Sequence, residues 1–313
     1  MIQFGGLQIS LDRREPASDI DFISHAHSDH IGAAKSSKRV LASDQTAELI
    51  SCAYGIEVSR SQLPDGATLL DAGHMLGSKQ LCMYDAESGI QTIYTGDFQT
   101  AYSRTSPKIE TKEADCVIMD STFYSQSFVF EHRADEEEAL AKWVSSRMEH
   151  GIVLLSAYRM GKAQDIISIL NDHQITPVVS SAISEINKIY KKNGVRLDCI
   201  SSSDPDHAEA LSGTFVGIIE NRRLEQMKLN LQRVHGRHVH TAYATGFAKV
   251  MRMNSDAQFV ISDHSDFMQS MEYIDATGAA DIYTYGANAA QFAANLSSKG
   301  YKAESLPKKF TLK

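Results

Sequence analysis

The spacing of apolar positions changes along the 313-residue chain, and each change indicates a different kind of structure. Up to residue 125, short apolar runs lie between Gly, Asp and Ser, a pattern typical of strands joined by tight turns. Such runs include DFISHAH (21–27), ATLLDAGH (67–74), IQTIYTGD (90–97) and DCVIMDS (115–121). A helix is predicted from Ser43 or Asp44, as N-cap, to a stop at Gly55. The first part of the chain is therefore expected to be rich in strands.

From residue 134 the pattern becomes an alternation of helices and strands. A helix with an acidic first turn is predicted over 134–151, followed by the strand IVLLS (152–156) and a helix over 161–173. Strands are again expected at 238–245 and 257–264, before helices at 267–278 and 287–300. We predict an α/β protein with a first part over 1–144, a β/α/β insertion over 145–245 and a final part over 246–313.

The amino-acid composition argues against several classes of protein. The formal net charge of −8 and the pI near 5.8 argue against a protein that binds nucleic acid through bulk positive charge. The four cysteines have no paired spacing, which argues against a disulfide framework or a cysteine zinc site. The absence of a long apolar run argues against a membrane protein, and the start MIQFGGLQIS does not resemble a signal peptide. These features predict a cytoplasmic protein.

The segment FISHAHSDHIG (22–32) crowds three histidines and an aspartate behind a short apolar run. His25 and His27 alternate, so at a strand end they point the same way, and Asp29 and His30 lie where the chain turns. Imidazole and carboxylate groups at this spacing suit a divalent metal such as zinc. The alternative is a polar turn that happens to contain histidines.

Two further segments have the same setting at a strand end. His74 follows an apolar strand in DAGHMLGS, and Asp97 follows another in YTGDFQT. Each alone is more often structural, because a GD pair is usually a turn and an isolated histidine is often a core donor. Taken with residues 25–30, they predict a metal site on the rim of a sheet.

These motifs carry a resemblance to a known family. SHAHSDH, AGHMLGS and TGDF resemble the metallo-β-lactamase superfamily, which implies a four-layer αββα sandwich over roughly residues 1–125. MDSTFYSQSFVF, SAYRMGKAQDI and VISDHSDF resemble the β-CASP nucleases, most closely the ligase-associated DNA exonucleases and the Artemis-type repair nucleases. The β/α/β insertion would then be the β-CASP domain, which small hydrolases of the superfamily lack.

The resemblance also implies a two-metal site, with zinc as the first choice. One metal would be held by His25, His27, His74 and a bridging Asp97. A weaker partner, with manganese or magnesium as alternatives, would be held by Asp29, His30 and Asp97. RNA-processing members carry a histidine where this chain has Tyr285, so the sequence favours DNA and a loosely held second metal.

The same resemblance implies a hydrolytic mechanism that uses metal-bound hydroxide. His264 would protonate the leaving oxygen with Asp120 orienting it, and Asp12 would orient a ligand or simply occupy a turn. Asp29 is counted with the catalytic residues as well as the ligands. Three residues at a strand-to-helix junction are candidates for binding a terminal phosphate: Tyr158, Arg159 and Lys162.

Four functions remain open from the sequence. The preferred one is a metal-dependent DNA 5′ exonuclease, hence a role in DNA repair with nucleic acid as partner. An RNA-processing β-CASP ribonuclease is the main alternative. A thiolester or lactone hydrolase would share the first motifs but would have no use for Asp120 and His264. A non-catalytic scaffold subunit is the last alternative, against which the retained histidines argue.

Overall fold

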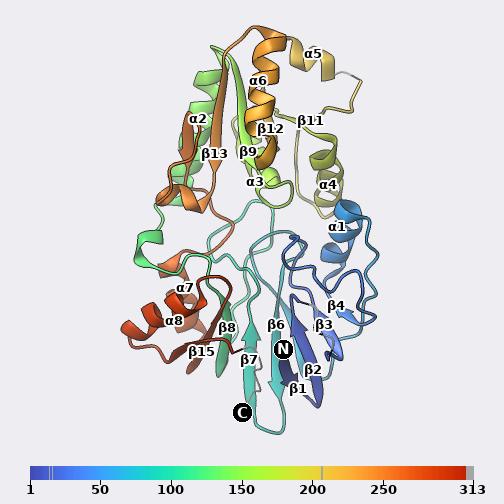
Figure 1. Cartoon of the computed structure of the whole chain (residues 1–313), viewed down its shortest axis with the longest axis vertical. Coiled ribbons are helices and arrows are strands. Elements are labelled where there is room, and N and C mark those ends of the chain that lie inside the picture. Colours follow the sequence, from blue (N-terminus) through green and yellow to red (C-terminus); the bar gives the residue numbers. More distant parts are fainter. Residues whose placement is uncertain (14, 16, 206, 308–313) are drawn as a thin grey trace. The chain divides into compact units, whose positions relative to one another are not determined.

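The computed structural model of the chain describes residues 1–13, 15, 17–205 and 207–307, and these form a mixed α/β fold with three β-sheets (Figure 1). Two compact units are present. Unit 1 joins Met1–Val129 to the segment from His264 onward, and unit 2 is Phe130–Asp263. The predicted α/β class is confirmed.

The limits of the interruption differ from the expected 145 and 245. Helix α2 (Arg133–Met148) packs on strand β9 (Ile152–Ala157), and β14 (Ala257–Phe259) pairs with β13 (Val239–Ala244). Unit 2 therefore begins before α2 and ends after β14, because its sheet needs both elements. Residues 308–313 of the expected final part lie outside the described residues.

Unit 1 contains two sheets. The four-stranded sheet has the order β1-β2-β3-β4 (Ile2–Phe4, Leu7–Leu11, Ile20–Phe22 and Val40–Leu41). The six-stranded sheet has the order β16-β15-β8-β7-β6-β5 (Ala303–Ser305, Asp281–Tyr285, Cys116–Asp120, Ile90–Tyr94, Lys79–Asp85 and Ala67–Asp71).

The directions of these strands define one functional edge of the six-stranded sheet. Strands β15, β8 and β7 are parallel, and β5 runs the same way because it is separated from β7 by the antiparallel β6. Their carboxyl ends thus lie at one edge, so the residues that follow β5 and β7 are brought near Asp120 and Tyr285. This edge is the place where the sequence predicts the metal ligands.

Two apolar cores hold unit 1 together. One lies between the sheets, where Phe22 and Ile9 of the four-stranded sheet join Leu81, Tyr94 and Ile118 of the other. The second covers the opposite face of the six-stranded sheet with residues of helices α7 (Phe267–Thr277) and α8 (Ala289–Ser298). The sheet is buried on both faces, which explains why every residue of β8 is buried.

Two helices of unit 1 begin and end where the sequence places them. In α1 (Asp44–Tyr54) the Ser43 hydroxyl accepts from the Thr46 amide, and Gly55 takes the left-handed conformation at the end. In α7 the Asp266 side chain forms a capping box with Gln269. Asp266 is two residues after His264, so this cap fixes the chain immediately after a candidate catalytic residue.

Unit 2 is built on a parallel sheet with the order β11-β10-β12-β9-β13-β14. The strands not yet introduced are β10 (Val178–Val179), β11 (Ile200–Ser201) and β12 (Val216–Glu220). Its further helices are α3 (Lys162–Asp172), α4 (Ser181–Lys192), α5 (His207–Ser212) and α6 (Leu224–His235). Single-turn helices are η1 (Gln126–Phe128) in unit 1, and η2 (Asn221–Arg223) and η3 (Gly246–Lys249) in unit 2.

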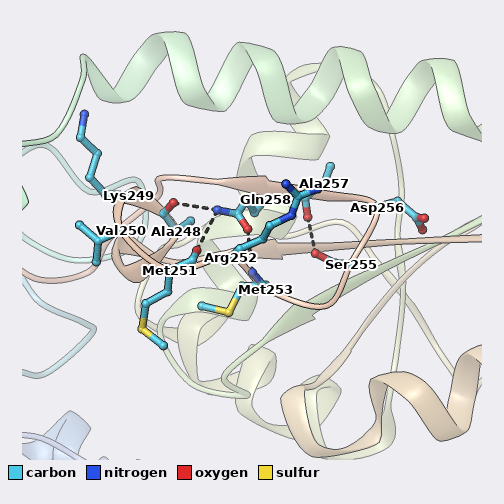
Figure 2. Close-up of a pocket in the computed structure, with 10 residues that line it drawn as sticks. All are labelled: Ala248, Lys249, Val250, Met251, Arg252, Met253, Ser255, Asp256, Ala257 and Gln258. Carbon is cyan, nitrogen blue, oxygen red and sulfur yellow. Dashed lines mark hydrogen bonds between the residues drawn. The ribbon is translucent and has the colours of Figure 1, made fainter.

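A surface hollow lies in unit 2 at the turn between η3 and β14 (Figure 2). The Gln258 side-chain amide donates to the carbonyls of Ala248 and Met251, which closes the turn around it. The hollow is lined by residues 248–253 and 255–258 and by none of the clustered histidines of unit 1. Separately, no helix among the described residues has the length and apolar character needed to cross a membrane.

Candidate active site

Three strand ends of unit 1 supply the predicted histidines and aspartate. His25 and His27 follow β3, His74 follows β5 and Asp97 follows β7. Gly96 makes the approach of two of these segments possible, because a Cβ at this position would lie 2.5 Å from the Cβ of Ser24. Its φ of +55° also favours glycine.

These side chains converge on one point. Ligand atoms of His25, His27, His74 and Asp97 all lie within 4.8 Å of one another. The Nδ1 of His27 lies 3.0 Å from Nε2 of His25 and 3.2 Å from Nε2 of His74. Three imidazole nitrogens and a carboxylate oxygen are a donor set that zinc accepts, so the residues present fit the metal that the sequence predicts.

Asp97 is shared between this cluster and His30. Its Oδ2 lies 3.6 Å from Nε2 of His25 and 3.2 Å from Nε2 of His30. Asp29 approaches the same His30 nitrogen at 3.6 Å, but its side chain is 77% exposed. The structure therefore brings His30 and Asp97 together and leaves Asp29 at the solvent edge of the group.

Burial and neighbouring charges shift the pKa values of these side chains in different directions. Burial, helped by the nearby His30, holds the pKa of His25 well below its usual value. Burial alone would lower the pKa of His30, but hydrogen bonds to Asp12 and Asp97 raise it to about 11. Burial would raise the pKa of Asp97, yet His264 and the hydrogen bond from His30 hold it well below its usual value. Asp97 is thus a carboxylate, the form that binds a cation.

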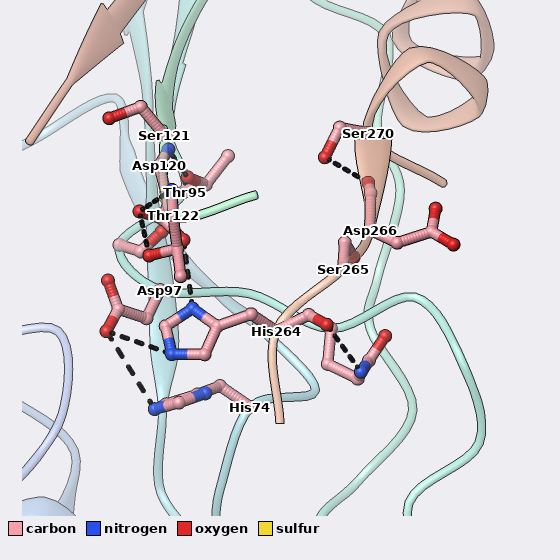
Figure 3. Close-up of polar contacts among 12 residues, drawn as sticks. His74, Thr95, Asp97, Asp120, Ser121, Thr122, His264, Ser265, Asp266 and Ser270 are labelled. Atoms are coloured by element: carbon pink, nitrogen blue, oxygen red, sulfur yellow. Dashed lines mark hydrogen bonds and ion pairs between the residues drawn. The ribbon is translucent and has the colours of Figure 1, made fainter. Parts of the chain in front are cut away.

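His264 and Asp120 form a second pair beside the cluster. The Nδ1 of His264 lies 2.9 Å from Oδ2 of Asp120, and the Thr122 amide and hydroxyl donate to the other carboxylate oxygen. Figure 3 shows the His74 and His264 rings both directed at Asp97, whose Oδ2 lies 3.9 Å from the Nε2 of each. Ligand atoms of Asp97, Asp120 and His264 also lie within 4.8 Å of one another.

The loop that follows Asp97 fixes the backbone around His264. The Gln99 side-chain amide donates to the His264 carbonyl at 2.9 Å, and the Thr100 amide donates to the Ser265 hydroxyl at 2.9 Å. The Gln99 amide donates to Ala72 at the other side. A Cβ on Gly73 would lie 2.1 Å from the Gln99 carbonyl oxygen, so this approach requires glycine.

Asp12 and Tyr285 lie behind the ligands. Asp12 accepts a hydrogen bond from Nδ1 of His30 at 2.9 Å, which agrees with the geometry expected of an orienting residue. Tyr285 ends β15, and its hydroxyl is buried, with its ring centroid 4.9 Å from that of Tyr94. Burial and the neighbouring Tyr94 raise the pKa of Tyr285 well above its usual value.

The three candidate phosphate contacts lie in unit 2 and differ from one another. Tyr158 is 63% exposed, and Arg159 is half-buried. Lys162 is 4% exposed, and its ammonium group donates to the Ile261 carbonyl and pairs with Asp263 at 2.6 Å. These contacts give Lys162 a structural role in place of the substrate contact expected from sequence.

The helix N-terminus expected to receive phosphate is also occupied. At the start of α3, the amides of Lys162, Ala163 and Asp165 already donate to the carbonyls of Met160, Tyr158 and Gly161. Three aromatic residues of unit 1 that a base could stack on are core residues instead, since Phe98, Phe123 and Phe267 are 4% exposed or less. An exposed ring near the site is Tyr102, at 73%, on the loop after Asp97.

Sequence reasoning missed Ser24 and Tyr94, which contact Asp12 directly. Both stand beside predicted ligands, in SHAH and YTGD, but their side chains carry no pattern that distinguishes them from ordinary strand residues. Tyr94 is 82 positions from its partner, so this contact emerges only in the folded chain.

Comparisons with known proteins identify sequences that are similar to this chain. No family model matches the sequence. The chain is 27% identical over 298 residues to a probable DNA ligase of Opitutus terrae, an alignment that covers 90% of this chain and 28% of the ligase. It is 28% identical over 190 residues to an RNase J-like protein of Methanocaldococcus jannaschii, covering 51% of this chain and 45% of the relative.

A third relative is the endoribonuclease YSH1 of Eremothecium gossypii, 32% identical over 138 residues, which are 43% of this chain and 17% of the relative. The chain thus spans less than half the length of each of these three proteins. The similarities confirm what the motifs indicate: this chain is a relative of the β-CASP nucleases of the metallo-β-lactamase superfamily.

Proposed function

We propose that this chain is a metal-dependent phosphodiesterase that shortens DNA from a 5′ end. The observation that carries the proposal is the convergence of His25, His27, His74 and Asp97 beside the pair of His264 and Asp120. A metal ligand set alone would suit many hydrolases. An oriented histidine beside it supplies what phosphodiester cleavage also needs, a proton for the leaving oxygen.

In this proposal unit 1 is the αββα sandwich of the superfamily and unit 2 is the β-CASP domain. Two observations on unit 1 support the assignment. The four-stranded sheet packs on one face of the six-stranded sheet, and helices α7 and α8 cover the other. The candidate ligands lie at one edge of the sheets, where loops can vary without disturbing the core.

We assign zinc to His25, His27, His74 and Asp97, and a second, weaker divalent ion, zinc, manganese or magnesium, to His30, Asp97 and Asp29. When bound, such ions lower the pKa of water toward neutrality and offset negative charge on phosphate oxygens. The burial of His25, His74 and Asp97 favours a tightly held first ion. The exposure of Asp29 favours a second ion that exchanges readily.

His264 then acts as the proton donor. Asp120 accepts a hydrogen bond from Nδ1 of His264 and so directs Nε2 toward Asp97 and the substrate side. A proton on Nε2 passes to the leaving oxygen as the phosphorus–oxygen bond breaks. The Thr122 amide and hydroxyl hold the other oxygen of Asp120, which keeps the ring from rotating.

Two features favour DNA as the substrate. The relative that aligns with 90% of this chain bears the name of a DNA ligase, and ligation requires prepared DNA ends. Tyr285 stands at the end of β15, where the motif pattern of RNA-processing relatives has a histidine. A role in DNA repair follows from this substrate.

Substrate contacts are assigned to exposed side chains. Tyr102 lies on a loop that is tied to Gly73 through Ser106 at 2.7 Å and to Ser265 through Thr100. This anchoring suits an aromatic ring that stacks on a base near the cluster. In unit 2, Tyr158 and Arg159 remain candidates for a terminal phosphate.

The test uses single-stranded DNA and RNA of the same sequence, each labelled at the 5′ end or internally. The proposal expects release of labelled mononucleotides or short products from the 5′ end of DNA, and slower cleavage of RNA. Preferential cleavage of RNA would refute the DNA assignment.

An RNA-processing nuclease is the second candidate, and the names of the RNase J-like and YSH1 relatives favour it. The same labelled RNA decides between the two. Turnover of a thiolester with no cleavage of either nucleic acid would favour a hydrolase of the same superfamily instead. Failure to bind metal would favour a scaffold subunit.

A further inference from the structure

Asp12 lies at the centre of a buried hydrogen-bond network behind the candidate ligands. Its Oδ2 accepts from the Tyr94 hydroxyl at 2.7 Å, from the Ser24 hydroxyl at 2.8 Å and from Nδ1 of His30 at 2.9 Å. Its Oδ1 accepts from the Ser24 amide at 2.7 Å. Four donors are as many as a carboxylate ordinarily accepts.

The direction of each hydrogen bond follows from the number of hydrogens available. An ionised carboxylate can only accept, so Nδ1 of His30 carries a proton and Nε2, 3.2 Å from Asp97, is the nitrogen available to a metal. The hydroxyl of Ser24 has one hydrogen, which it gives to Asp12. It must therefore accept from Nδ1 of His25, which lies 2.9 Å away.

Asp12 consequently sets the tautomers of two candidate ligands. It acts on His30 directly and on His25 through the Ser24 hydroxyl. In both rings a proton is held on Nδ1, which leaves Nε2 as the nitrogen that can bind a metal; His30 gives up its Nε2 proton when the metal binds. Asp12 itself is held in the left-handed region, with φ at +56°, and its amide donates to the Phe22 carbonyl.

We propose that the Tyr94 hydroxyl is a positioning group for metal binding: it fixes the Asp12 carboxylate that sets the Nε2 ligand tautomers of His30 and His25. The inference rests on the metal site of the proposed function. It goes beyond that function by naming two residues that are not metal ligands, Tyr94 and Ser24, as residues on which metal affinity depends.

The surroundings of Tyr94 suit this role. The side chain is 1% exposed, and its ring packs edge-on against Phe22 and tilted against Tyr285, with centroids 6.0 and 4.9 Å away. The ring therefore has little freedom, and the hydroxyl points at one carboxylate oxygen. Removing the hydroxyl would leave Asp12 one donor short in a buried place, where water cannot easily replace it.

The test is Tyr94→Phe, which keeps the ring and deletes the donor. Zinc affinity is measured by titration against a competing chelator, without any nucleic acid, and should fall about 10- to 100-fold, the usual effect of losing a group that orients a metal ligand. In the metal-free protein, nitrogen NMR of labelled histidines should show a changed Nδ1–H signal for His30 and a shift of the neutral His25 ring from the single Nδ1–H form to a mixture.

The matched control is Tyr285→Phe, which deletes a phenol hydroxyl whose ring packs against the ring of Tyr94 but which is not among the donors to Asp12. It should bind zinc as the unaltered protein does. Ser24→Ala is a second variant, and it should change the nitrogen signals of His25 more than those of His30. Thermal unfolding of each variant shows that it is folded before metal is added.

Wild-type zinc affinity and unchanged histidine spectra in Tyr94→Phe would overturn the proposal, as would an equal loss in Tyr285→Phe. Because these measurements use no substrate, they are independent of the cleavage assay. A protein that binds zinc as described but cleaves no nucleic acid would refute the proposed function and leave this inference standing.

Discussion

The contacts of His264 suit a proton donor better than a metal ligand. Its Nδ1 is bonded to Asp120, and its Nε2 lies 3.9 Å from the carboxylate oxygen of Asp97, which the His25 and His30 rings also approach. The ring thus stands at the border of the cluster.

We predict that His264→Ala lowers kcat for DNA cleavage about 10²- to 10⁴-fold, the usual worth of a positioned acid, while zinc content stays unchanged. Asp120→Asn should cause a smaller fall, since the ring remains but its orientation is weaker. The exposed His150→Ala, in unit 2, serves as control. Loss of zinc together with activity in His264→Ala would make His264 a ligand.

Tyr102 provides a prediction about substrate binding. Its ring is 73% exposed on an anchored loop, and stacking on one base is worth about 1–3 kcal/mol. Tyr102→Ala should raise KM for single-stranded DNA about 10-fold and leave hydrolysis of a small phosphodiester unchanged. Tyr84→Ala, another exposed tyrosine of unit 1 at 49%, should change neither. Equal loss on both substrates would show that Tyr102 supports the fold or the metals.

The sequence predicts the limits of a helix or strand well where neighbouring residues determine them. Helix α1 was expected between Ser43 and Gly55 and is found at Asp44–Tyr54, because capping residues act within a few positions. Helix α6 was missed, since its N-cap is Arg223 and makes no side-chain cap hydrogen bond. The short β16 was also missed, since its place is set by pairing with β15.

The same difference between neighbouring residues and distant contacts applies to the candidate site. His74 and Asp97 were predicted because they follow apolar strands, a feature visible in the sequence. Lys162 was expected to face substrate, but it is buried against the Ile261 carbonyl, 99 positions away, and no local pattern foretells that partner. Tyr94 was missed for the same reason. Contacts between distant segments decide which polar residues are functional and which are structural.

Arg133 of α2 offers a prediction on stability. Its guanidinium bonds to Glu137 at 2.7 Å, to the Ser262 carbonyl at 2.8 Å and to Asp165. Arg133→Gln should lower the free energy of unfolding by about 3–5 kcal/mol, because a buried acid loses its partner. Urea unfolding followed by fluorescence of Trp143, the single tryptophan, reports on unit 2.

Lys142→Gln is the control on the same helix. Lys142 pairs with Glu138 at 3.0 Å, but its side chain is 72% exposed, so the loss should be within about 1 kcal/mol. Equal effects of the two substitutions would contradict the assigned importance of the buried network.

His240 of β13 predicts a pH dependence for unit 2. Burial and the neighbouring His238 hold the pKa of His240 below its usual value, and its buried Nε2 lacks a hydrogen-bond partner among the described residues. As pH falls below about 6.5, the unfolded chain therefore takes up a proton before the folded chain does. The stabilisation is present above that pH and is lost as pH falls through the pKa of the folded state.

The urea midpoint should thus decrease between about pH 7.5 and pH 5.5, and less so in His240→Gln. The other charged groups around the ring, His238, His150, Arg147 and Asp256, remain in both proteins. An identical pH dependence in the variant would show that a different group is responsible. Trp143, whose ring centroid lies 6.4 Å from that of His240, provides the signal.

On the scale of the whole molecule, the chain combines a net charge of −8 with a proposed polyanionic substrate. General electrostatic attraction cannot hold such a substrate, so binding must come from local groups and from bound cations. Unit 1 supplies such local groups, because the first 120 residues and the segment from His264 onward share one sheet edge.

The central claim is that these distant segments form a divalent metal site on which catalysis depends. Elemental analysis of the purified protein and of Asp97→Asn, combined with cleavage of 5′-labelled DNA before and after chelation, tests it most directly. The claim predicts zinc in the unaltered protein, little zinc and no activity in Asp97→Asn, and activity that chelation removes and added zinc restores. Normal cleavage by a protein without bound metal, or by Asp97→Asn, would contradict it.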